Sequence, residues 1–160
     1  WGQAAAIVKS AIPELFDDSL GRFKRSLTDS TLDASAFAVW YFGILPADDP
    51  RVVSTMQGIE NELKRPSGGI ARYMHDSYQG YMNSWIICTL WQAQWHIALR
   101  KVNLALKLIQ WCADHTHCTG LMPEQIADDG TFRSVLPLMW SHCAFVLTVL
   151  EYLEALGSDT

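Results

Sequence analysis

The chain has 160 residues, of which 49% are hydrophobic and 18% are charged, and its formal net charge is −5. This length can bury one core of ordinary size, so we expect a single domain over residues 1–160. The scattered Lys and Arg residues argue against nucleic acid or an anionic membrane surface as partner, and no apolar run reaches the roughly 18 residues of a membrane span.

Hydrophobic periodicity predicts six helices and no convincing strand ladder, so the expected fold class is all-α. Residues 84–98 are apolar on nearly all sides, which predicts the most buried helix. A short connection follows, and it predicts an antiparallel hairpin with the next helix. The first helix has no start signal, which suggests a piece of a longer chain. The six helices are expected at residues 3–16, 34–42, 48–63, 84–98, 101–116 and 139–156.

Two of the connecting segments are unusually long. Residues 17–29 mix turn residues with isolated apolar positions, which predicts a long loop or a short extended pair. Residues 70–83 carry three tyrosines together with Arg72, His75 and Asp76. Polar, aromatic and ionisable groups on a loop between rigid helices are typical of a binding rim.

Four cysteines occur in the chain, and two of them bracket His115 and His117. Cys112 and Cys118 lack the CxxC or HxxxH spacing of a zinc site, so we expect free thiols, with neither a metal nor a cofactor. Thiols inside apolar helical runs behave as small buried hydrophobes and favour a reducing compartment such as the cytoplasm.

The loop at residues 120–125 places a carboxylate, Glu124, between two apolar helices. Pro123 restricts the backbone before it, and Gln125 offers an amide that could hold the carboxylate or a ligand hydroxyl. General acid–base chemistry is one role for Glu124. Capping or salt-bridging a helical turn is the simpler role on spacing alone, because catalysis needs a second, differently tuned group.

Other candidates leave similar alternatives open. Arg72 and Asp76 could bind vicinal hydroxyls through charge-assisted hydrogen bonds, or they could form an ion pair on the rim. Trp85 and Trp140 each lie at the start of a helix, where an indole could stack on a sugar ring or pack in the core.

Four segments in this order together resemble the C-terminal half of glycoside hydrolase family 15, the glucoamylase, glucodextranase and trehalase group: IARYMHDSY (70–78), NSWIICTLW (83–91), GLMPEQ (120–125) and VLPLMWSH (135–142). The resemblance covers residues 17–156. It implies an (α/α)6 barrel of twelve helices, of which this chain supplies about the last six, as a C-terminal fragment of the catalytic domain.

The resemblance also implies roles for single residues. Glu124 would be the general base of an inverting enzyme that cleaves α-glucosidic bonds and releases glucose. The general acid lies in the family's earlier half and has no match here, so we expect the fragment alone to be inactive. Ser84 replaces the family's Pro before Trp85, His75 replaces an acidic residue, and Met139 replaces Thr. The residues expected to bind the α-glucoside or oligosaccharide are Arg72, Tyr73, Asp76, Trp85, Gln125 and Trp140.

A half-barrel exposes helix faces that its other half would cover. Contiguous apolar surface of that size drives association, so we expect the fragment to form a homo-oligomer through its exposed apolar face. The alternative function is therefore a non-catalytic half-barrel that binds carbohydrate or self-associates.

Overall fold

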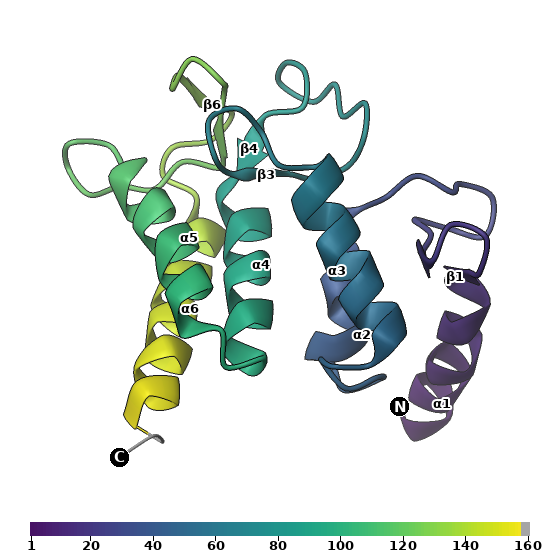
Figure 1. The fold of residues 1–160 in the computed structure, drawn as a ribbon. Coiled ribbons are helices and arrows are strands. Elements are labelled where there is room, and N and C mark those ends of the chain that lie inside the picture. Colours follow the sequence, from purple (N-terminus) through teal and green to yellow (C-terminus); the bar gives the residue numbers. More distant parts are fainter. Residues whose placement is uncertain (158–160) are drawn as a thin grey trace.

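The computed structural model describes residues 1–157 as a mostly helical domain (Figure 1). Six α-helices lie in this part of the chain, as the periodicity predicts. They are α1 (Gly2–Ala11), α2 (Ala38–Tyr41), α3 (Pro50–Glu62), α4 (Ile86–Ala98), α5 (Val102–Asp114) and α6 (Met139–Gly157), with two short 3-10 helices, η1 (Ile12–Leu15) and η2 (Ala34–Phe37).

The prediction that the chain contains no strand ladder is wrong. Strands β1 (Phe16–Asp17) and β2 (Arg22–Phe23) form an antiparallel pair in the segment that was expected to be a loop or a short extended pair. A second, four-stranded antiparallel sheet has the order β3-β4-β5-β6. Each strand is only two residues long, too short for an alternating pattern to show in the sequence. The strands of the second sheet are β3 (Ile70–Ala71), β4 (Ser84–Trp85), β5 (Gln125–Ile126) and β6 (Phe132–Arg133).

Helix starts follow side-chain capping where an acid is present. The Asp33 carboxylate accepts a hydrogen bond from the Ser35 backbone at the start of η2. At the start of α3, the Asp49 carboxylate accepts a hydrogen bond from the Arg51 backbone, and Pro50 occupies the first turn. The start of α4 differs from the predicted range of residues 84–98. Ser84 and Trp85 belong to β4, so Trp85 is the N-cap and the helix begins at Ile86.

Helix α4 is the most buried helix of the domain, as its all-round apolar sequence predicts. Its side chains enter all three hydrophobic clusters: Trp95 faces α3, Leu90 packs with Cys112 of α5, and Ala93 packs with Ala155 of α6. Burying a side chain such as Leu90 fully stabilises the fold by about 1.5–3 kcal/mol. Helix α4 and helix α5 are antiparallel neighbours, as expected (Figure 1).

The loops of the candidate site gather at one end of the helices. Figure 1 shows β3, β4 and β6 together at the end where α3 finishes and α4 begins. The segment that carries Glu124 joins this end through β5, which lies between β4 and β6. The four-stranded sheet therefore ties residues 70–85 to residues 120–135.

Helix α6 exposes an apolar stripe along its length. Met139, Val146, Leu150 and Leu153 are each more than half exposed, and they recur at spacings of seven, four and three residues on one face. A hollow of about 440 Å³ lies against this face and is lined almost wholly by apolar atoms of α6. No helix among residues 1–157 combines the length and the apolar character that crossing a bilayer requires.

Candidate active site

The backbone of Glu124 is fixed from two sides. Its N–H donates to the carbonyl of Val135 at 2.9 Å, and its carbonyl accepts from the N–H of Ile86 at 3.2 Å. Met122 and Ile126, two residues away on either side, are buried in one hydrophobic cluster. The side chain of Glu124 is half-buried, and its Oε2 accepts a 3.4 Å hydrogen bond from Gln125 Nε2. The carboxylate therefore lies on an anchored segment.

Gln125 links this carboxylate to the Tyr-rich loop. Its side chain is fully buried, and its Oε1 accepts a 2.9 Å hydrogen bond from Asn83 Nδ2. Asn83 in turn donates to the carbonyl of Gln79 at 3.1 Å. Because Oε1 is engaged by Asn83, the Nε2 group of Gln125 is oriented towards Glu124.

Arg72 and Asp76 form the ion pair that was one of their two expected roles. Arg72 donates from Nε and Nη2 to the two Asp76 oxygens at 3.0 and 2.9 Å, and Asp76 is only 2% exposed. Burial lowers the pKa of Arg72, but the hydrogen bonds and charge of Asp76 outweigh it, so this pKa lies above its ordinary value. The Arg72 guanidinium thus remains charged.

Trp85 joins the ion pair to the Glu124 segment. The guanidinium carbon of Arg72 lies 4.4 Å from the Trp85 ring centroid, and Trp85 pairs with Gln125 across β4 and β5. The structure therefore brings Arg72, Asp76, Trp85, Gln125 and Glu124 into one connected group, which we call the loop cluster. Trp85 is 4% exposed, and its indole Nε1 has no hydrogen-bond partner among residues 1–157.

Tyr73 lies beside the loop cluster. Its hydroxyl accepts a 3.3 Å hydrogen bond from Arg72 Nη2, and the guanidinium groups of Arg72 and Arg25 both lie over its ring. Its contacts are thus with arginine side chains. The sequence gives no indication of the contact with Arg25, because the two residues are 48 positions apart and belong to different segments.

Tyr78 is a further member of this region that the sequence analysis did not single out. Its N–H donates to Asp76 at 3.0 Å and its hydroxyl lies 3.2 Å from Ser134 Oγ, so it bridges the Tyr-rich loop to the strand side of the Glu124 segment. The surrounding loop is tightly wound, since His75, Gln79 and Met82 all have positive φ angles. Two signals could have pointed to it: the clustering of tyrosines in residues 73–81 and its place at the end of the segment IARYMHDSY (70–78).

Trp140 does not join the loop cluster. It lies at the start of α6, as expected, but it is 56% exposed and its ring centroid is 6.0 Å from that of Trp91. With Phe37 and Phe42 it lines an apolar hollow of about 440 Å³ between α2, α4 and α6, and no residue of the loop cluster lines that hollow. Trp140 therefore contributes to this hollow and not to the loop cluster.

The cysteines and histidines form no larger cluster. All four cysteines are free thiols, with Cys88 and Cys112 buried, and burial raises the pKa of Cys88. Within residues 1–157, no three His, Cys, Asp or Glu side chains are grouped so that they could hold a metal ion.

Curated relatives of the chain are glycoside hydrolases. An uncharacterized glycosyl hydrolase of Methanocaldococcus jannaschii is 34% identical over 169 residues, which cover 94% of this chain and 27% of that protein. The trehalase of Mycobacterium tuberculosis is 29% identical over 160 residues, covering 97% of this chain and 23% of the trehalase. The chain thus spans about a quarter of the length of these relatives. No family model matches it.

Solved structures show the same similarity in three dimensions. A glycosidase in complex with glucose superposes with a TM-score of 0.81 at 25% identity, over 94% of this chain and 43% of the glycosidase chain. A bacterial glucoamylase complexed with acarbose superposes with a TM-score of 0.72 at 24% identity, over 79% of this chain and 21% of that chain. The fold therefore matches part of the glucoamylase (α/α)6 fold, and the expected resemblance to the trehalase and glucoamylase group is confirmed.

Proposed function

We propose that this chain, similar to trehalases and glucoamylase of glycoside hydrolase family 15, supplies the C-terminal part of an (α/α)6 barrel in its parent protein. That protein hydrolyses α-glucosidic bonds with inversion and releases glucose. The observation that carries this proposal is the anchored, half-buried carboxylate of Glu124, which is linked through Gln125 to Trp85 and from there to the Arg72–Asp76 pair. Trehalases among the relatives and a glucose-bound glycosidase among the matching structures support the substrate class.

Glu124 acts as the general base in this proposal. Its carboxylate accepts a proton from the attacking water, and Gln125 holds Oε2 through the 3.4 Å hydrogen bond from Nε2. The fixed backbone keeps the carboxylate in place while the sugar is bound, which lowers the entropy cost of reaching the reactive geometry.

The rest of the loop cluster binds the sugar. Arg72 Nη1 makes no hydrogen bond to residues 1–157, so it can donate to a sugar hydroxyl while Nε and Nη2 hold Asp76. Within residues 1–157, the indole Nε1 of Trp85 is a buried donor without a partner, and such donors are rare unless a ligand or water satisfies them. Tyr73 borders this site, whereas Trp140 lies outside the loop cluster and lines a separate apolar hollow.

The general acid comes from outside these 160 residues. An inverting glycosidase needs two carboxyl groups roughly 6.5–9.5 Å apart, so that a water fits between the base and the anomeric carbon. The isolated chain therefore gives no turnover.

The test is Glu124→Gln in the intact protein, assayed with maltose and trehalose. We expect kcat to fall by roughly 10²–10⁴-fold, the range of a lost general base, with KM nearly unchanged. The matched control is Glu14→Gln, which removes an exposed carboxylate that is far from Glu124 in the sequence. Unchanged turnover of Glu124→Gln would remove the assignment.

A second candidate function is self-association of the chain as a half-barrel, and the exposed stripe of α6 favours it. Met139, Val146, Leu150 and Leu153 form a continuous apolar face, which is typical of a helix that packs on a partner. We expect the isolated chain to sediment as a dimer or larger, and Leu150→Glu to shift it to monomer. Leu104→Glu on α5 is the control, and a monomer before mutation would exclude this function.

A further inference from the structure

Two guanidinium groups share the ring of Tyr73. The Arg25 guanidinium carbon lies 3.7 Å from the ring centroid, and that of Arg72 lies 4.7 Å from it. Arg25 belongs to the long loop after β2, outside the four segments on which the family resemblance rests. Its close approach to Tyr73 gives this loop a direct contact with the edge of the loop cluster.

Arg25 is held in place by carboxylates. Its Nε lies 3.3 Å from Asp33 Oδ2 and its Nη1 lies 3.5 Å from Asp29 Oδ2. Asp33 is itself buried, and its other oxygen accepts a 2.8 Å hydrogen bond from the Ser35 backbone. The Arg25 guanidinium is therefore paired with a buried carboxylate, that of Asp33, which a backbone hydrogen bond holds in place.

The segment that follows Arg25 also binds the backbone of Arg72 and Tyr73. Ala34 N–H donates to the Arg72 carbonyl at 2.7 Å, and Asp33 forms an antiparallel bridge with Tyr73. Residues 25–34 thus contact this dipeptide through both backbone and side chain. The Tyr73 hydroxyl then accepts from Arg72 Nη2, the nitrogen that also donates to Asp76.

We infer that Arg25 is a positioning residue for the sugar-binding guanidinium of Arg72. Arg25 fixes the plane of the Tyr73 ring, and the ring and hydroxyl of Tyr73 hold the Arg72 guanidinium against Trp85 and in its two-pronged contact with Asp76. Arg25 touches no reacting atom. The inference rests on the proposed function for its kinetic consequence, and its geometric part stands on these contacts alone.

The test is a double-mutant cycle in the intact protein with Arg25→Met, Arg72→Met and the double variant. We expect Arg25→Met to raise KM roughly two- to fivefold, as for loss of one exposed cation–π contact, with kcat little changed. In the Arg72→Met background the same substitution has no further effect, because the group that Arg25 positions is gone.

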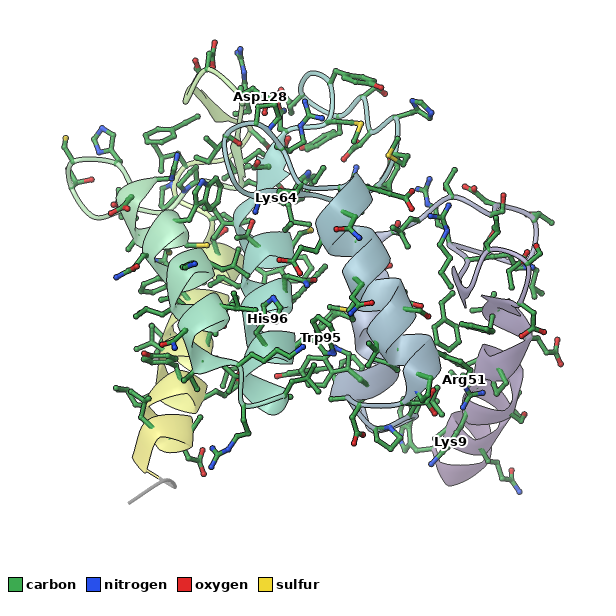
Figure 2. The ribbon with its side chains drawn as sticks, in the orientation of Figure 1. Lys9, Arg51, Lys64, Trp95, His96 and Asp128 are labelled. Atoms are coloured by element: carbon green, nitrogen blue, oxygen red, sulfur yellow. The ribbon has the colours of Figure 1, made fainter. Side chains whose placement is uncertain are left out.

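The matched control is Arg51→Met. Arg51 has nearly the same side-chain exposure as Arg25 (39% against 37%) and also pairs with an aspartate. It lies at the N-terminal end of α3, which is the end away from the four-stranded sheet (Figure 2). It should leave KM unchanged. Arg25→Lys keeps the charge beside Asp33 but loses the planar stack, so it should lie between wild type and Arg25→Met. It also replaces Arg25→Met if that variant fails to fold.

A second readout does not depend on catalysis. In the intact protein labelled with ¹⁵N-arginine, the Arg72 Nε–H signal should shift or broaden in Arg25→Met and not in Arg51→Met. If Arg72→Met leaves KM unchanged, the proposed function fails while this signal still reports the positioning. If Arg72→Met raises KM but Arg25→Met acts equally in both backgrounds, or leaves both KM and the signal unchanged, the inference is overturned.

Discussion

Ser141, near the start of α6, donates a 2.9 Å hydrogen bond from Oγ to the carbonyl of Pro123, the residue before Glu124. One residue further on, His142 Nε2 accepts a 3.0 Å hydrogen bond from the N–H of Met122. The first turn of α6 thus holds the loop that carries the proposed base. Two hydrogen bonds therefore join the first turn of α6 to the segment that carries Glu124. A substitution in this turn should affect the candidate site.

Replacing Ser141 with alanine tests this link. Ser141 is fully buried, so Ser141→Ala leaves the Pro123 carbonyl without its partner, a loss of about 1–3 kcal/mol in the free energy of unfolding. We expect urea denaturation to show this loss, and kcat of the intact protein to fall with it. Ser10→Ala removes an exposed hydrogen bond to the Ile7 carbonyl and should change stability little. Equal stability of the two variants would contradict the link.

Asn83 supports the site from the opposite side. Asn83→Ala removes the 2.9 Å hydrogen bond that orients Gln125 and leaves the buried Oε1 of Gln125 without a donor. We expect unfolding to become easier by about 1–3 kcal/mol and kcat to fall, because Gln125 no longer holds Glu124. Urea denaturation and kcat of the intact protein measure the two effects. A stability loss with an unchanged kcat would mean that Asn83 serves the fold alone.

The helices could be predicted from the sequence because each carries a long apolar pattern or a clear cap. Residues 86–98 are apolar over more than three turns, and Asp49–Pro50 is a start signal that depends on neighbouring residues only. The two-residue strands could not be predicted. Trp85 and Gln125 pair although 40 positions separate them, and nothing local to either residue encodes that register.

The same division holds for the candidate site. Glu124, Arg72, Asp76 and Trp85 could be selected because short motifs carry them, and the structure brings them together. Trp140 also lies in a motif, yet its ring contacts Trp91 and lines a hollow to which the loop cluster does not contribute. Side-chain direction on a helix depends on which neighbours it meets, and those neighbours come from distant segments. Arg25 lacks a motif, so only the fold reveals its contact with Tyr73.

Glu151 provides a test of charge burial. Burial raises the pKa of Glu151, the hydrogen bond from Gln94 opposes this, and Glu154 adds to it. The folded pKa lies above the unfolded one, so the fold loses stability as pH rises through this interval. We expect Glu151→Gln to be more stable than wild type at pH 7, and the difference to vanish in acid. Thermal unfolding at pH 7 and pH 3.5 measures it, and a less stable variant at pH 7 would refute the expectation.

Glu60 on α3 and His96 on α4 give the opposite dependence on pH (Figure 2 shows His96 beside Trp95). His96 Nε2 lies 3.6 Å from Glu60 Oε2 and lowers the pKa of Glu60, while partial burial acts in the other direction. A folded pKa below the unfolded one means that Glu60 stabilises the fold above its unfolded pKa. This stabilisation is lost as pH falls through the folded pKa.

Glu60→Gln should therefore flatten the acid side of the stability profile. Wild type loses part of its free energy of unfolding through protonation of Glu60 as the pH falls below 4.5, the ordinary pKa of glutamate, and the variant lacks that part. Urea denaturation at several pH values measures both curves, with Glu14→Gln as the exposed control. Parallel curves for wild type and Glu60→Gln would show that the contact between α3 and α4 does not depend on this charge.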